Sequence, residues 1–263
     1  MSDDTVGGVY DRRAGSYASV RPDYPDEVFD TIASYASAST GARVLEIGCG
    51  AGQATLAMTA RGWRVDAVEP GEQLIEQAQH RCSSQPVRFH RGRFEDVSPE
   101  PTAFDVVAAG TSWHWIDPAV SYARAFEMLR PHGTIALFWN AHVPDTDLPQ
   151  WEPIRATYRD VAPALTRLAP LTPDRHDYVP HDELQTCGVF DHIEAHRFGF
   201  EVRYTTQDFL ELIATYASHE ALEPATRQRL HEQLRDTIDN QLDGVATKPY
   251  EALLVLGSRR ASR

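Results

Sequence analysis

The sequence predicts an α/β fold in which a doubly wound, mostly parallel sheet of seven strands carries a helical cap insertion. Three observations support this prediction. Short apolar runs alternate with helical stretches through the first 140 residues, the first run ends in a glycine-rich turn, and prolines interrupt the pattern from residue 144 onward. Strands that alternate with helices form parallel sheets with right-handed crossovers, so the fold class follows from the order of the elements.

The first strand is expected at residues 41–47, which are β-branched and apolar and end in a turn containing Gly48, Gly50 and Gly52. Before the helix that leads to the fifth strand, Asp117 should be the N-cap and Pro118 the first helical residue. The spacing of apolar residues places the other strands at 63–68, 87–90, 104–109, 134–139, 190–202 and 250–257, and helices at 53–60, 72–81, 118–129, 206–216 and 224–239.

The organisation changes between residues 141 and 188, where seven prolines interrupt helical fragments such as 151–161. This stretch is interpreted as an inserted helical cap that contributes to substrate binding. The remaining residues, 1–140 plus 189–263, form the expected core, because the later helices and strands complete the sheet. The sequence shows no internal repeat.

The composition of the chain limits the kinds of molecule that it is expected to bind. The 263 residues carry 25 Lys and Arg against 38 Asp and Glu, a net charge of 25 − 38 = −13. An acidic surface disfavours nucleic acid and anionic membranes. The three cysteines form no paired motif, and no apolar run is long enough for a signal peptide or a membrane span. We expect a cytoplasmic protein, a monomer or homodimer, whose partner is a small molecule.

The glycine turn reads Glu46-x-Gly48-x-Gly50-x-Gly52 and lies where an open α/β sheet forms its ligand crevice. Glycines allow close approach of the backbone to a ligand, and the following helix directs N–H groups at it. A dinucleotide fingerprint requires a third glycine at the position of Gln53, which disfavours a nicotinamide oxidoreductase without excluding one. The acidic Glu46 suits a cationic ligand better than a pyrophosphate.

These residues resemble a known family. VLEIGCGAG at positions 44–52, followed by Glu69 at the end of the next strand, resembles the first two motifs of class I S-adenosylmethionine-dependent methyltransferases. FED at 94–96 and LRPHG at 129–133 resemble two later motifs, the second with His132 in place of a glycine. RPDYP at 21–25 and SWHW at 112–115 are similar to the methyltransferase type 11, or trans-aconitate methyltransferase-like, small-molecule subgroup. The resemblance covers residues 10–140 and the last strand, and implies a Rossmann-like fold with S-adenosylmethionine as cofactor.

The resemblance also implies roles for individual residues. Glu69 should accept hydrogen bonds from both ribose hydroxyls, since a carboxylate presents two acceptor oxygens to a diol. Glu46 should lie near the methionine ammonium, and Asp96, or its neighbour Glu95, should bind the adenine amine. The expected cofactor-binding set is Tyr17, Glu46, Gly48, Cys49, Gly50, Gly52, Gln53, Glu69, Pro70, Phe94, Glu95, Asp96 and Thr111.

The acceptor side is expected around the loop that holds His114. Methyl transfer needs a base only if the nucleophile arrives protonated, and His114 is the catalytic candidate, although it could equally be a structural histidine. Tryptophans 113 and 115 could be core aromatics instead of a substrate wall. The expected substrate-binding set is Tyr24, Trp113, His114, Trp115, Trp139 and His142.

Other chemistries find little support. His192 and His196 lack a third ligand at a known spacing, so no metal site is expected. The sequence contains neither a G-x-S-x-G elbow nor a P-loop lysine. We therefore expect S-adenosylmethionine-dependent methyl transfer to a small molecule, favouring O-methylation, possibly of a carboxylate. A nicotinamide-dependent oxidoreductase and a non-catalytic S-adenosylmethionine-binding module are the alternatives.

Overall fold

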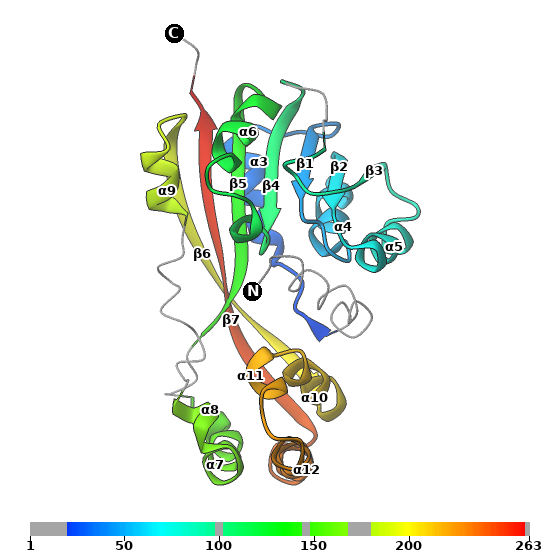
Figure 1. The fold of residues 1–263 in the computed structure, drawn as a ribbon, viewed down its shortest axis with the longest axis vertical. Coiled ribbons are helices and arrows are strands. Elements are labelled where there is room, and N and C mark those ends of the chain that lie inside the picture. Colours follow the sequence, from blue (N-terminus) through cyan, green and yellow to red (C-terminus); the bar gives the residue numbers. More distant parts are fainter. Residues whose placement is uncertain (1–19, 98–101, 144–147, 168–179, 261–263) are drawn as a thin grey trace.

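The fold comes from a computed structural model that describes residues 20–97, 102–143, 148–167 and 180–260. One sheet of seven strands runs in the order β3-β2-β1-β4-β5-β7-β6, and only β7 is antiparallel to its neighbours (Figure 1). The predicted doubly wound, mostly parallel sheet is therefore confirmed. The strands are β1 Arg43–Ile47, β2 Arg64–Glu69, β3 Val87–Arg91, β4 Phe104–Gly110, β5 Leu129–His142, β6 Phe190–Thr205 and β7 Val245–Arg259.

Helices cover both faces of the sheet because each central strand is apolar on both sides. In β1, Val44 packs in the cluster beneath α3 and α4, whereas the next residue, Leu45, packs in the cluster beneath α6 and α9. The helices of this part are α3 Asp26–Ala36, α4 Gln53–Ala60, α5 Glu72–Arg81, α6 Ser121–Met128 and α9 His181–Thr186, with a 3₁₀ turn, η1 Trp113–Trp115.

The start of α6 differs from the expectation. The helix begins at Ser121, and Asp117 instead closes a turn before it, in which the Asp117 carboxylate accepts from the Ala119 N–H at 2.9 Å. The Ser121 N–H bonds the carbonyl of Asp117 at 3.0 Å, so the chain enters the helix only after this turn. The expected N-cap at Asp117 and the expected first helical residue, Pro118, are therefore both wrong, because the N-cap is Val120.

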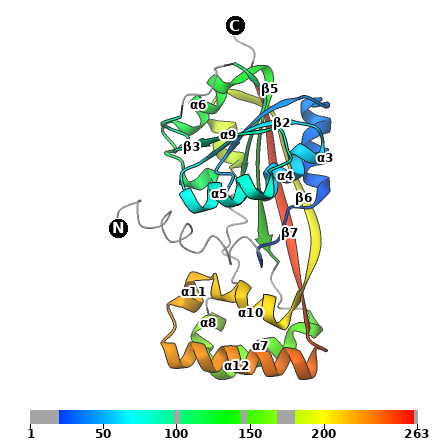
Figure 2. The same ribbon diagram turned by 90° about the vertical axis from the view of Figure 1, so that its right-hand side faces the viewer.

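A second group of helices lies beyond the lower ends of β6 and β7 (Figures 1 and 2). We call it the helical lobe. Its elements share one apolar cluster, in which Trp151 and Ile154 pack with Leu212, Leu230 and Leu234. The lobe consists of η2 Pro149–Trp151, α7 Glu152–Val161, α8 Pro163–Arg167, α10 Thr206–Ala214, α11 Ala217–Glu220 and α12 Pro224–Gln241.

Two segments build this lobe, one on each side of residue 188. Pro224 occupies the first turn of α12, and the Glu223 side chain caps it by accepting from the Thr226 N–H at 3.1 Å. The α9 helix, which also falls within 141–188, packs on the main sheet through Leu184. The role of residues 141–188 as a substrate-binding cap stays a prediction. Because helices after residue 205 pack in the same apolar cluster, such a cap would include them as well.

Candidate active site

A cavity of about 490 Å³ opens at the carboxyl ends of β1, β2, β4 and β5. This is the edge of an open α/β sheet at which ligands bind. Because the strand order is β2-β1-β4-β5-β7, the cavity runs across the sheet from Glu69 on β2 to Tyr250 on β7. Of the expected site residues, it is lined by Tyr24, Glu46, Gly48, Cys49, Gly50, Gln53, Glu69, Pro70, Phe94, Glu95, Thr111, His114 and Trp115.

The glycine turn forms the wall of the cavity between β1 and α4. The N–H groups of Gly48 and Cys49 both donate to the Val68 carbonyl, at 2.8 and 3.1 Å, which fixes the turn against β2. A Cβ at Gly48 would lie 2.5 Å from that of Ser112, and φ is +67° there. At Gly50, φ is +54° and a Cβ would meet nothing within 4 Å, so the backbone faces open space.

Glu69 is the best-aligned acidic group of the site. Its two carboxylate oxygens accept from the N–H groups of Gly50, at 3.0 Å, and Gly71, at 2.8 Å, and only 6% of the residue is exposed. A carboxylate has about four acceptor positions, so two backbone donors do not exhaust it. The geometry therefore holds Glu69 rigidly at the end of β2, next to the glycine turn.

Glu46 lies below the same turn and is almost fully buried, at 1% exposure. Burial raises its pKa to about 7, opposed by the Thr55 hydroxyl, which donates to the carboxylate at 2.6 Å, and assisted by the negative charge of Glu69. A cationic ligand in the cavity would favour the charged form of this carboxyl. Two acidic groups on one side of the cavity thus form an environment suited to positive charge.

The cysteine of the turn is buried. Burial raises the pKa of the Cys49 thiol well above its usual value, and the charges of Glu46 and Glu69 raise it further. Since the thiolate is the reactive form, this environment disfavours a role for Cys49 as a nucleophile. Its contribution to the cavity is its backbone and its small buried side chain.

Thr111 and Tyr24 meet above the end of β4. The Tyr24 hydroxyl and the Thr111 hydroxyl lie 2.7 Å apart, and the Thr111 N–H donates to the Phe138 carbonyl at 2.8 Å. Thr111 has a φ of +56°, an uncommon conformation for a β-branched residue. The Tyr24 ring packs edge-on against Phe138 at 4.8 Å. The segment before α3 is thereby joined to the floor of the cavity, and substrate binding by Tyr24 stays a prediction.

The SWHW segment divides between core and cavity. Trp113 is 6% exposed and its ring lies 5.1 Å from that of Tyr122, so it belongs to the hydrophobic core and does not line the cavity. His114 is exposed at the cavity mouth, with its ring 4.6 Å from that of Trp115, which is 46% exposed. A three-residue 3₁₀ turn separates their side chains in this way, because successive residues point in different directions.

The other expected residues lie elsewhere. Gly52 is the N-cap of α4, where a Cβ would lie 3.1 Å from Ala78, so it serves helix packing. Asp96 is exposed outside the cavity, and its neighbour Glu95 lines it. Trp139 is half-buried on β5 away from the cavity. The predicted roles of two further residues stay untested. His142 is the last residue of β5, and Tyr17 lies outside the described residues.

Several cavity residues were not expected. Arg21 lines the cavity, and its guanidinium carbon lies 5.1 Å from the ring centroid of Tyr216, which follows α10. Tyr250 on β7 and Asn140 on β5 also line it, and Asn140 donates to the Pro22 carbonyl at 3.2 Å. Arg21 stands in the RPDYP motif and could have been chosen from it. No sequence motif pointed to Tyr250 as a cavity residue, because it lies near the far end of the chain and reaches the cavity only through the antiparallel pairing of β7 with β5.

The described parts of the chain contain no cluster of three or more His, Cys, Asp or Glu side chains that could hold a metal ion. Within the same residues, no helix is both long and apolar enough to cross a bilayer.

Comparisons with known proteins agree with this geometry. Residues 45–137 match the profile of a methyltransferase domain family. An uncharacterized methyltransferase of Mycobacterium tuberculosis is 32% identical over 126 residues, which are 48% of this chain and 49% of that protein. The chain thus matches about half the length of the first curated relatives.

Two solved structures share the fold. A protein of Anaeromyxobacter dehalogenans, provisionally described as a type II methyltransferase, superposes with a TM-score of 0.64 at 24% identity, covering 91% of this chain and 97% of that one. The [4+2]-cyclase SpnF superposes with a TM-score of 0.56 at 16% identity, covering 99% and 98%. At this level of identity the structures establish the fold alone.

The matched segment, residues 45–137, is a methyltransferase type 11 domain. It overlaps the motifs that resemble class I S-adenosylmethionine-dependent methyltransferases, a family whose cofactor is S-adenosylmethionine. The site fits this cofactor on two structural grounds: the backbone at Gly50 faces open space, and two buried carboxylates lie beside it.

Proposed function

We propose that the chain transfers a methyl group from S-adenosylmethionine to an oxygen of a small-molecule acceptor, with a carboxylate as the favoured acceptor group. The observation that carries the proposal is the Glu69 carboxylate, held beside the glycine turn by backbone donors at 2.8 and 3.0 Å. When bound, the cofactor supplies a methyl group on a positively charged sulfur, which is activated for in-line displacement.

The cofactor half of the site would be held by groups already in place. Glu69 presents two carboxylate oxygens, which would accept from the two ribose hydroxyls. Glu46 supplies negative charge for the methionine ammonium, and the ammonium would in turn favour its ionised form. Phe94 and Glu95, which follow β3 and line the cavity, would flank and bind the adenine.

The acceptor half lies toward Arg21, Tyr24, His114 and Tyr250. Arg21 stacks on Tyr216 and brings a positive charge to the side of the cavity that adjoins the helical lobe, away from Glu69 on β2. A cation at this position supports an anionic acceptor, since a guanidinium binds a carboxylate with two parallel hydrogen bonds. Trp115, exposed at the mouth, would cover the bound molecule and exclude water.

The need for a base depends on the acceptor atom. A carboxylate is ionised at neutral pH and needs no proton removal, so the chain would only align it with the methyl group. In that case His114 orients the acceptor by a hydrogen bond. If the acceptor were a hydroxyl, His114 would instead have to accept its proton, and turnover would follow the ionisation of the histidine.

The test is a product assay. The purified chain is incubated with methyl-labelled S-adenosylmethionine and a panel of small carboxylic acids, each paired with its amide and its alcohol. We expect label on the acids alone, in a product that releases methanol in mild base, as a methyl ester does. A base-stable product, or labelling of amides or alcohols in preference to acids, would contradict carboxylate methylation while leaving methyl transfer intact.

A further inference from the structure

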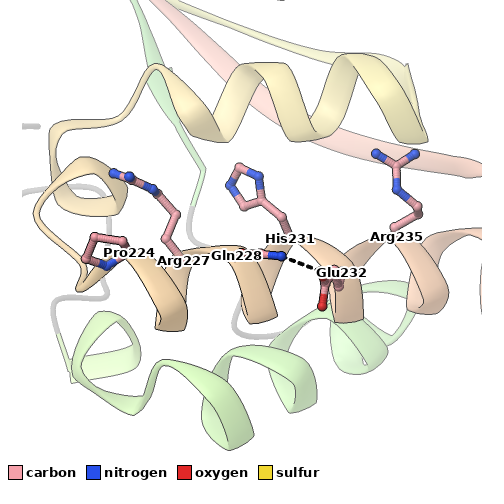
Figure 3. A pocket seen from close by; sticks show the side chains of 6 residues that line it. All are labelled: Pro224, Arg227, Gln228, His231, Glu232 and Arg235. Atoms are coloured by element: carbon pink, nitrogen blue, oxygen red, sulfur yellow. Dashed lines mark hydrogen bonds between the residues drawn. The ribbon is translucent and has the colours of Figure 1, made fainter.

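A second cavity, of about 440 Å³, lies in the helical lobe along α12 (Figure 3). It is lined by Pro224, Arg227, Gln228, His231, Glu232 and Arg235, all from this one helix. None of these residues lines the cofactor cavity, so the two cavities are separate. We call this second cavity the α12 groove.

Three basic side chains follow the α12 groove. Arg227, His231 and Arg235 recur every four residues, which places them on one face of the helix. Figure 3 shows all three side chains extending from the same side of α12, Arg227 toward α11 and the other two toward α10. At a rise of about 1.5 Å per residue, neighbouring members are about 6 Å apart along the axis and the outer two about 12 Å.

Carboxylates do not neutralise these groups. The Arg227 guanidinium donates to the backbone carbonyl of Glu220 at 3.2 Å, and Arg235 forms no ion pair with any described residue. The nearest acidic side chain of the groove, Glu232, accepts from Gln228 at 3.0 Å. The groove therefore sets two arginines against one carboxylate in a chain with a net charge of −13.

The histidine at the centre has an unused polar atom. His231 Nε2 is buried and has no hydrogen-bond partner within the described part of the chain. Burial lowers the pKa of His231, and the positive charges of Arg227 and Arg235 lower it further, with His219 of α11 also close by. An anion in the groove would oppose the charges of Arg227 and Arg235 and so raise the pKa of His231.

We propose that the α12 groove binds a small, multiply charged anion that carries phosphate groups. Guanidinium groups match phosphate oxygens with paired hydrogen bonds, and two of them flank a histidine here. The backbone positions of Arg227 and Arg235 lie about 12 Å apart along the helix axis, so two linked phosphates can meet both long side chains more readily than a single phosphate can. The groove is far too short for a nucleic-acid backbone, which the net charge also disfavours.

The site is independent of the proposed methyl transfer. The ligand of the groove would not be the methyl acceptor, because the reacting groups lie in the other cavity. The groove occupies the lobe whose apolar cluster includes Tyr250, a residue that also lines the cofactor cavity. A ligand on α12 could therefore influence the acceptor side through this packing, and the experiment tests binding itself, without relying on activity.

The experiment is calorimetric titration of the full chain with inorganic pyrophosphate at fixed ionic strength. We expect saturable binding that weakens at least about 10-fold in Arg227→Gln and in Arg235→Gln, since each loses a charged hydrogen bond. Arg229→Gln is the matched control, because it removes the same charge from α12 outside the groove. Circular dichroism confirms that each variant folds.

Proton NMR of the histidine rings provides a second readout. Pyrophosphate should raise the pKa of His231, whose signal is assigned from the spectrum of His231→Gln, by reducing the effect of Arg227 and Arg235. Glu232 and His219, the other titratable neighbours, are present in every sample. Absence of saturable binding up to about 10 mM, or equal weakening by Arg229→Gln, would overturn the proposal.

Discussion

The cofactor side of the sheet and the helical lobe are built in different ways. On the cofactor side, six consecutive residues from Glu46 to Ala51, with Glu69 at the end of the next strand, form one wall of the cavity. In the lobe, residues 149–167 pack against residues 206–241, which are separated from them in sequence. A site made by one continuous turn is determined by local geometry, whereas the lobe depends on tertiary packing alone.

The two regions also differ in charge. The cofactor end of the cavity contains Glu46, Glu69 and Glu95 with one arginine, Arg93, whereas the α12 groove contains two arginines and a histidine with one carboxylate, Glu232. Acidic groups predominate in the first region and basic groups in the second, so the two favour ligands of opposite charge. The proposed anion site in the lobe rests on this difference.

The largest effect is expected from the core of the lobe. Leu234→Ala removes a fully buried side chain from its shared cluster, and we expect a loss of about 2–5 kcal/mol in the free energy of unfolding. Denaturant unfolding measures this loss. Calorimetry on the folded variant should give unchanged S-adenosylmethionine affinity; a parallel loss of affinity would show that the two regions are not separate.

On the cofactor side, Glu46→Gln should stabilise the ligand-free protein at high pH. Because burial raises the Glu46 pKa from 4.5 to about 7, the folded state holds its proton more tightly, and stability falls as pH rises through that window. Replacement by Gln removes this loss, which amounts to about 3 kcal/mol. Unfolding should therefore show a gain at pH 8 that is much smaller at pH 5. Equal gains at both pH values would refute the titration of Glu46.

At the cavity mouth, His114→Ala should lower kcat by about 10–100-fold, equivalent to one hydrogen bond to a charged group, without changing cofactor affinity. Steady-state kinetics on an identified acceptor, with calorimetry on the same sample, separates the two quantities. If kcat of the wild type does not change with pH across the range in which histidines titrate, His114 orients the acceptor and does not take its proton. If His114→Ala leaves kcat unchanged, His114 has no role in the site.

The smallest effect isolates one contact of the glycine turn. Gly48→Ala and Gly188→Ala both introduce a Cβ at positive φ, +67° and +77°, but only the first meets a neighbour, the Ser112 Cβ at 2.5 Å. The difference between their unfolding free energies should be about 1–3 kcal/mol, which is the cost of overpacking. No difference would mean that the loop of Ser112 moves aside freely.

The sequence predicted the sheet and the glycine turn well because both depend on local patterns. The helices at 53–60 and 72–81 begin and end where expected, and Glu69 ends β2 as its motif implied. The prediction for Trp113 could not separate core from cavity, because a tryptophan satisfies both and only the direction of the 3₁₀ turn decides. Tyr250 and the lobe packing arise from the pairing of β6 with β7, which no local pattern encodes.

The measurement that tests the central claim most directly is calorimetric titration with S-adenosylmethionine and S-adenosylhomocysteine, with NAD as the control ligand. It compares the wild type with Glu69→Ala and with Glu72→Ala, which removes an exposed carboxylate paired with Arg91. We predict micromolar binding to the wild type and Glu72→Ala, binding weaker by about 10–100-fold in Glu69→Ala, and no heat from NAD. Binding of NAD without S-adenosylmethionine, or full affinity in Glu69→Ala, would contradict the account.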